Sequence, residues 1–113
     1  MSPEVEQVRH HLAVLARQRR TRVLGWPREW RPTEVVNPAT GEPFTEAGAW
    51  EHIADLLDGG HPLEEVTLVH PPGKRAYVML EDLRPGSPRL YVKIQLGSGV
   101  VIGRSFHLSR FEQ

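Results

Sequence analysis

Apolar side chains recur every three or four residues in two stretches of the chain, which is the spacing of an amphipathic helix. The first stretch runs from Pro3 to about Arg20 and follows a Ser-Pro pair typical of a helix start. The second begins after Thr45, a favourable N-cap residue, and ends at a Gly-Gly pair. The two apolar faces consist of Val5, Val8, Leu12 and Leu15 in the first helix and of Ala49, Trp50, Ile53, Ala54, Leu56 and Leu57 in the second.

The stretch between these helices, residues 25–45, contains four prolines and a cluster of turn-forming residues at 37–41. We interpret it as a long loop with a short strand at residues 34–36. Trp26 and Trp30 lie four positions apart in this loop, and we expect them to anchor it onto the core. The alternative is that this aromatic pair stacks on nucleic-acid bases.

Four strand-like runs, each ended by turn residues, follow in the second half of the chain, and the third of them alternates cleanly between apolar and polar positions. The predicted strands are residues 64–70, 75–81, 89–96 and 100–109, and their short connections favour an antiparallel meander. The sequence therefore predicts one α+β domain over residues 1–113. Residues 1–45 form a helix and a long loop, and residues 46–113 form a helix and a four-stranded antiparallel sheet.

The last two predicted strands form a hairpin, and its register follows from keeping apolar side chains on one face. A three-residue loop at 97–99 pairs Ile94 with Ile102 and leaves open space at Gly103, beside Lys93. Arg104 falls on the apolar side in this register, unless it lies at the sheet edge or a bulge turns it outward. The opposite face carries a set of polar side chains: Tyr91, Lys93, Gln95, Ser105 and His107.

The charges of the chain balance, with 14 basic and 14 acidic residues, but they are segregated. Residues 1–36 hold seven Arg and four Glu, residues 37–65 hold seven acids and no Lys or Arg, and residues 66–113 hold seven basic and three acidic residues. A strongly basic chain would have indicated a nucleic-acid partner. Here a basic surface requires the two ends of the chain to fold together, and the alternative is that the charges serve only solubility.

The absence of cysteine excludes disulfides, thiolate metal sites and a cysteine nucleophile. None of the six histidines has the spacing of a helical zinc site, so we predict neither a metal nor a cofactor. No apolar run approaches the length of about 18 residues that a membrane span needs. We therefore expect a cytoplasmic protein without a membrane partner.

The polar face of the hairpin has residue types suited to cleaving RNA through its 2′-hydroxyl group. That reaction needs a base, an acid and positive charge beside the phosphate, which His, Lys and Arg can supply. The turn that follows the first predicted strand adds His70, Lys74 and Arg75, and it either lies beside this face or is an ordinary exposed hairpin. The same residues also fit a plain solvated strand face.

The order of a helix and then a meander ending in LYVKIQLGSGVVIGRSFHLS resembles the small ribonuclease toxins of the RelE superfamily, and among them most nearly the motility quorum-sensing regulator (MqsR-like) toxins. The resemblance spans residues 46–108, and His107 stands where that family has a Lys. It implies a RelE-like fold, metal-independent cleavage of mRNA and a cognate antitoxin as partner. The residues that match the family pattern are Tyr91, Lys93, Ile94, Ser105 and Phe106.

The leading hypothesis is an mRNA interferase-like endoribonuclease with RNA lying across the polar face. His107 would be the general acid or base and Tyr91 the orienting group, with Lys93 as a third catalytic residue. The residues expected to contact RNA are Lys74, Arg75, Gln95, Arg104 and Ser105. Two alternatives are nucleic-acid binding without chemistry and a non-catalytic protein-interaction module that docks through the acidic second helix and the Arg-rich end of the first. The oligomeric state stays open.

Overall fold

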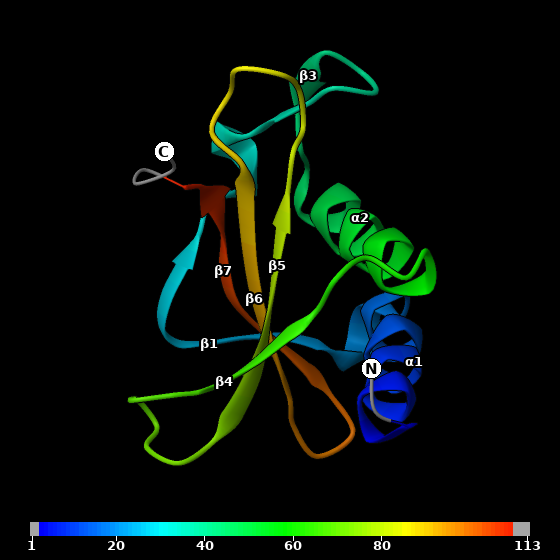
Figure 1. Cartoon of the computed structure of the whole chain (residues 1–113), viewed down its shortest axis with the longest axis vertical. Coiled ribbons are helices and arrows are strands. Elements are labelled where there is room, and N and C mark those ends of the chain that lie inside the picture. The colour runs from blue at the N-terminus through cyan, green and yellow to red at the C-terminus, as the bar shows by residue number, and fades with distance from the viewer. Residues whose placement is uncertain (1–2, 110–113) are drawn as a thin grey trace.

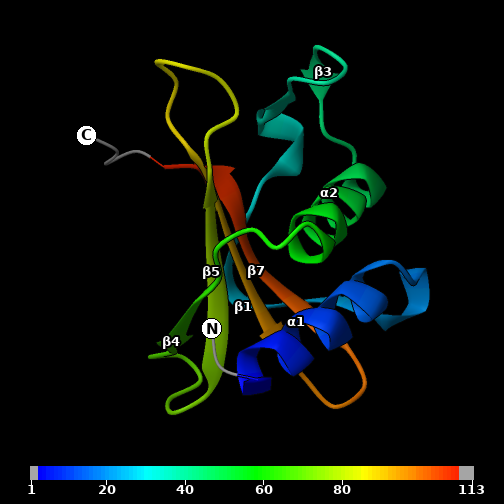
Figure 2. The ribbon, with the colours of Figure 1, turned by 45° about the vertical axis from the view of Figure 1, so that its right-hand side comes forward.

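The computed structural model describes residues 3–109 and consists of a twisted five-stranded sheet with two helices on one face (Figures 1 and 2). Within the described part of the chain, no helix has both the length and the apolar character needed to cross a membrane. The main elements are α1 (Pro3–Ala16), β1 (Arg22–Trp30), α2 (Glu46–Asp58), β4 (Glu64–Thr67), β5 (Arg75–Glu81), β6 (Leu90–Leu96) and β7 (Val101–Leu108). The short elements are two 3-10 turns, Arg19–Thr21 and Pro32–Glu34, and a small ribbon of β2 (Val36–Asn37) and β3 (Glu42–Pro43).

The sheet has the strand order β1-β7-β6-β5-β4, in which the four C-terminal strands form the antiparallel meander predicted from the sequence. The expectation of a purely antiparallel, four-stranded sheet is wrong, because β1 joins the edge and runs parallel to β7. Residues 25–30 of β1 lie in the stretch for which the sequence predicts a loop. Gly25 and Pro27 break the alternation that would have indicated a strand, and the pairing register with β7 shifts between Leu24 and Glu29. β1 bends at this shift (Figure 1).

The register of the β6–β7 hairpin also differs from the expected one. Leu96 pairs with Val101, so residues 97–100 form the connection, and Ile94 pairs with Gly103 rather than Ile102. The register then shifts by one residue, which makes Arg104 the extra residue of a β-bulge. Gly103 is also not beside open space. A Cβ atom built there would lie 2.7 Å from the Trp30 ring, so the glycine permits a close approach of β1 to β7.

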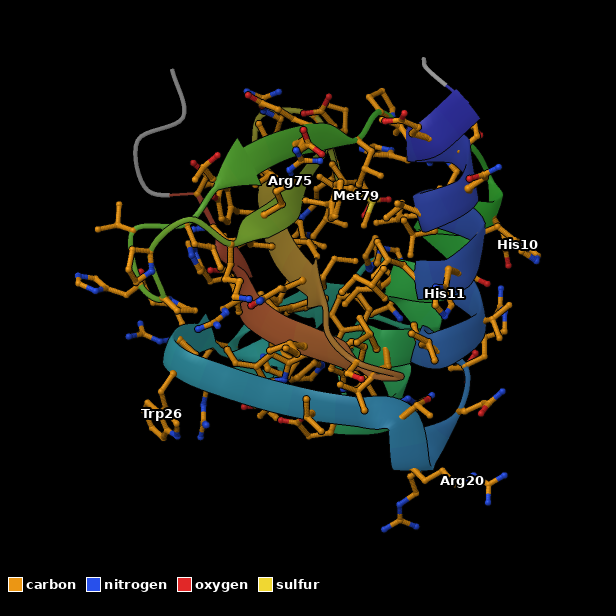
Figure 3. All side chains as sticks on the ribbon, turned by 90° about the horizontal axis from the view of Figure 1, so that it is seen from below. His10, His11, Arg20, Trp26, Arg75 and Met79 are labelled. Atoms are coloured by element: carbon orange, nitrogen blue, oxygen red, sulfur yellow. The ribbon has the colours of Figure 1, made fainter. Side chains whose placement is uncertain are left out.

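The core lies between the sheet and the helices, where Met79 is seen among the buried side chains (Figure 3). Trp30 packs into it, with ring centroids 4.9 Å from Trp50 and 5.6 Å from Phe106. Trp30 therefore anchors its segment as expected. Trp26 does not: 72% of its surface is exposed, and its side chain points away from the body of the molecule (Figure 3).

Side chains satisfy the terminal backbone groups at the start of α2 and at the end of α1. α2 begins after the predicted N-cap Thr45, whose hydroxyl accepts a 2.8 Å hydrogen bond from the Gly48 amide. α1 ends at Ala16, four residues earlier than expected, because the chain turns back onto its last carbonyls. The Thr21 hydroxyl donates to the Leu15 carbonyl and Arg22 Nε donates to the Ala16 carbonyl, each at 2.7 Å.

The segregated charges are paired with one another at the α1–α2 contact. Arg17 donates to carboxylates of Glu51, Asp55 and Asp58 at 2.8–2.9 Å. Arg22 adds a second contact to Glu51 at 3.2 Å. The acidic side of α2 and part of the Arg-rich end of α1 thus form ion pairs with each other within the molecule.

Candidate functional site

The polar face expected on the last hairpin exists, on the side of the sheet away from the helices. On β6, Tyr91 and Lys93 alternate with the fully buried Val92. Their partners on β7 are His107 and Ser105. The Tyr91 and His107 rings are stacked with centroids 5.4 Å apart, and the Lys93 ammonium lies 6.0 Å from the Tyr91 ring. The structure therefore brings the three predicted catalytic side chains side by side.

The bulge in β7 turns Arg104 onto this same face, one of the two outcomes anticipated for it. Its guanidinium is buried, with only 6% of the residue exposed. Nε and Nη2 donate to Gln95 Oε1 at 3.1 and 2.8 Å, and Nη1 donates to the Trp26 carbonyl at 2.7 Å. A Cβ on Gly25 would lie 2.9 Å from this guanidinium, so the glycine makes room for it. Arg104 thus ties the floor of the face to the bend in β1.

The face is hollowed into a pocket of about 310 Å³. Its floor is formed by Lys93, Arg104 and Ser105, and one wall is formed by Arg28 and Glu29 at the bend of β1. The opposite wall is the start of the β4–β5 turn, residues 67–70. In Figure 1 this turn extends past the sheet on the side of the view where β1 bends. The twist of the sheet, the bend of β1 and the β4–β5 turn therefore make this strand face concave.

Positive charge dominates this pocket. Arg28, Lys93 and Arg104 contribute three permanent cations, against the single carboxylate of Glu29. Two groups that accept hydrogen bonds from Arg104, the Gln95 side chain and the Trp26 carbonyl, are neutral. Arg28 also lies over the Trp26 ring at 3.9 Å, in a cation–π contact. Hydroxyl groups come from Ser105 and Thr67; they can donate to an anion.

Two of the predicted catalytic residues lie outside this pocket. His107 opens onto a different hollow of about 240 Å³ at the other end of β7, which it shares with Glu29 and Glu34. Its Nδ1 lies 2.9 Å from the Leu108 carbonyl, which places the ring proton on Nδ1 in the neutral form. Burial raises the pKa of Tyr91, and the carboxylates of Glu64 and Glu29 raise it further. Tyr91 is therefore a neutral phenol near pH 7.

The remaining predicted RNA contacts are divided. Arg104 and Ser105 line the pocket, while Gln95 is buried beneath it as the acceptor for Arg104. Lys74 and Arg75 do not line it, and Arg75 lies 3.6 Å from Glu65 instead. The catalytic and RNA-contact roles themselves stay predictions. Across residues 3–109, no group of three His, Asp or Glu side chains could hold a metal ion.

Sequence reasoning missed five residues of the pocket, which are Arg28, Glu29, Thr67, Leu68 and Val69. Arg28 and Glu29 lie in the segment interpreted as loop, so nothing indicated that they would reach the polar face. Thr67 was expected within a longer strand that in fact ends there. His70, for which both a place beside the face and plain exposure had been considered, lines the pocket.

Comparison with known proteins does not support the resemblance to RelE-superfamily toxins. No family model and no solved structure matches the chain. A curated protein, the holo-[acyl-carrier-protein] synthase of Methylorubrum populi, is 41% identical to it over 56 residues, covering 46% of this chain and 41% of that enzyme. The match thus spans about two-fifths of the enzyme's length.

This match corrects two interpretations of the sequence. The name of the matched protein is that of a carrier-protein synthase, so the interpretations as a toxin–antitoxin ribonuclease and as a non-catalytic interaction module are both wrong. RNA and an antitoxin as partners are untested and stay predictions. What the comparisons add is a partial similarity to a holo-[acyl-carrier-protein] synthase.

Proposed function

We propose that this protein binds a small molecule bearing a phosphate group in the pocket between β1, β6–β7 and the β4–β5 turn. The observation that carries this proposal is the convergence of Arg28, Lys93 and Arg104 on one concave site with a single carboxylate, Glu29. A guanidinium or ammonium group forms its strongest hydrogen bonds with phosphate or carboxylate oxygens. Three such groups at one site favour a ligand with more than one negative charge, which a phosphate monoester has at neutral pH.

The size of the pocket supports a small ligand. A volume of about 310 Å³ is at the lower end of the range for small-molecule sites. The buried position of Arg104 and Ser105 supports specific recognition rather than a diffuse surface attraction, because charges near low-dielectric walls are less screened by salt. Ser105 and Thr67 supply hydroxyl donors for those phosphate oxygens that accept no hydrogen bond from the cations.

Isothermal titration calorimetry with inorganic phosphate and simple phosphate monoesters tests the proposal. We expect Lys93→Ala to weaken binding roughly 10- to 150-fold, since one charge-assisted hydrogen bond contributes roughly 1.5–3 kcal/mol. Lys74→Ala is the matched control, because Lys74 is exposed and lies outside the pocket, and it should leave the affinity unchanged. Equal losses in both variants, or no binding to the wild type, would refute the pocket as a phosphate site.

A second candidate function comes from the partial match. The relative's name states that it is a synthase of holo-acyl carrier protein, and 41% identity over 56 residues supports a carrier protein as a partner of this chain too. The test is to incubate the protein with an apo acyl carrier protein and a deproteinised cell extract, and to follow the intact mass of the carrier. A mass increase that requires this protein supports the candidate. An unchanged carrier, together with no binding by calorimetry, counts against it.

A further inference from the structure

The wall of the pocket opposite β1 carries two apolar side chains, between Thr67 and His70. Leu68 and Val69, which both line the pocket, follow directly after β4. Leu68 is buried, and its backbone closes the turn: its amide donates to the Lys74 carbonyl at 2.6 Å and its carbonyl accepts from the Gly73 amide at 3.3 Å. The base of this wall is thereby fixed, and the next residue is held at the rim.

Val69 at this rim is 74% exposed, which makes it an exposed branched apolar side chain beside a cationic pocket. A ligand that covers such a side chain removes apolar surface from water, and this removal favours binding. The cations on the far wall and on the floor, Arg28 and Lys93, attract the charged end of a ligand. The pocket therefore has a cationic side at β1, β6 and β7, while the side at the β4–β5 turn adds the apolar surface of Leu68 and Val69.

We infer that the ligand is an amphiphilic phosphate ester: its phosphate lies against Arg28, Lys93 and Arg104, and its alkyl part lies against Leu68 and Val69. This inference rests on the proposed function and adds the chemical class of the group that carries the phosphate. A ligand of purely polar character would leave Val69 in water and would gain nothing from this wall. An alkyl group of a few carbons covers Val69 while the phosphate keeps its contacts.

A homologous series of alkyl phosphates separates this inference from the proposal beneath it. We expect the dissociation constant to fall from methyl to propyl to hexyl phosphate, by up to about fourfold for each methylene that becomes fully covered. Val69→Thr keeps the branched shape but exchanges a methyl group for a hydroxyl. This variant should lose most of the gain in affinity with chain length. Val36→Thr, at an exposed valine of β2, is the matched control and should behave as the wild type.

The outcomes are distinct. A dissociation constant that does not change with chain length, or a gain that survives in Val69→Thr, overturns the amphiphilic ligand while the phosphate site stands. Failure of every phosphate ester to bind overturns the phosphate site itself. Because Val69 is exposed, its variant is expected to fold, and its circular dichroism and melting curve should match those of the wild type.

Discussion

At the scale of single residues, Tyr91 on the polar face of the β6–β7 hairpin gives the first testable prediction. Burial and the carboxylates of Glu64 and Glu29 raise its pKa above the ordinary value. The folded state then holds the phenol proton more tightly than the unfolded state. The stability that depends on Tyr91 is accordingly complete below about pH 10, the unfolded value, and is lost as the pH rises through the folded pKa.

We expect Tyr91→Phe to reduce this alkaline loss of stability. Urea unfolding of the wild type and the variant between pH 8 and pH 11 measures it. Tyr77, whose pKa burial also raises, stays in the variant and should retain its own part of the pH dependence. If the two proteins lose stability with the same slope above pH 10, Tyr91 is not held in its neutral form by the fold.

Arg104 gives a second prediction at the scale of single residues, because its buried guanidinium donates hydrogen bonds to both Gln95 and the Trp26 carbonyl. Arg104→Met removes both contacts and leaves the Gln95 amide buried beneath the face. A buried polar group left without its partner costs about 1–3 kcal/mol, and we expect a loss of stability of this size. The double variant Arg104→Met with Gln95→Leu should recover part of it, since both polar partners are then gone. Strictly additive losses in urea unfolding would show that the pair is not coupled.

At the scale of elements, the parts of the fold that depend on local pattern could be predicted from the sequence. The helical spacing, the Thr45 cap and the alternation in β6 are each set by residues that are close together in the sequence. β1 could not, because Gly25 and Pro27 interrupt its pattern and its partner β7 lies far along the chain. The hairpin register failed for a related reason: a bulge adds one residue to a strand without leaving a distinct mark in its sequence.

The parallel β1–β7 pair depends on a close approach that Gly103 permits. A methyl group there would lie 2.7 Å from the Trp30 ring and 2.9 Å from Leu24. We expect Gly103→Ala to destabilise the protein by about 1–3 kcal/mol, the usual effect of overpacking. Hydrogen exchange of the β1 amides should report the loss first, because β1 is an edge strand and pairs with β7 alone. An unchanged melting temperature with unchanged β1 protection would contradict this packing.

At the scale of the whole molecule, oppositely charged side chains of different elements pair with one another. Arg17 joins α1 to three carboxylates of α2, and its side chain is 40% exposed at this contact. We expect Arg17→Met to lower the melting temperature at low ionic strength, and the difference should shrink as salt screens the pairs. Thermal unfolding in 20 mM and 500 mM sodium chloride measures it. Arg19→Met is the control, because this exposed residue forms none of these ion pairs.

The site shows the same limit of sequence reasoning at larger scale. The polar face of β6 and β7 follows from alternation alone, so Tyr91, Lys93 and Ser105 could be grouped in advance. Whether that face is open or concave depends on segments far away in sequence, the bend of β1 and the β4–β5 turn. Arg28 becomes part of the site only through that tertiary arrangement.

The most direct test of the central claim is a titration of the isotope-labelled protein with inorganic phosphate, followed by amide chemical shifts. The phosphate site predicts saturable shifts that cluster at residues 28–29, 67–70, Lys93 and 104–105, which surround one pocket. Shifts centred on the exposed arginines of the 3-10 turn after α1, or an unchanged spectrum at millimolar phosphate, would contradict it.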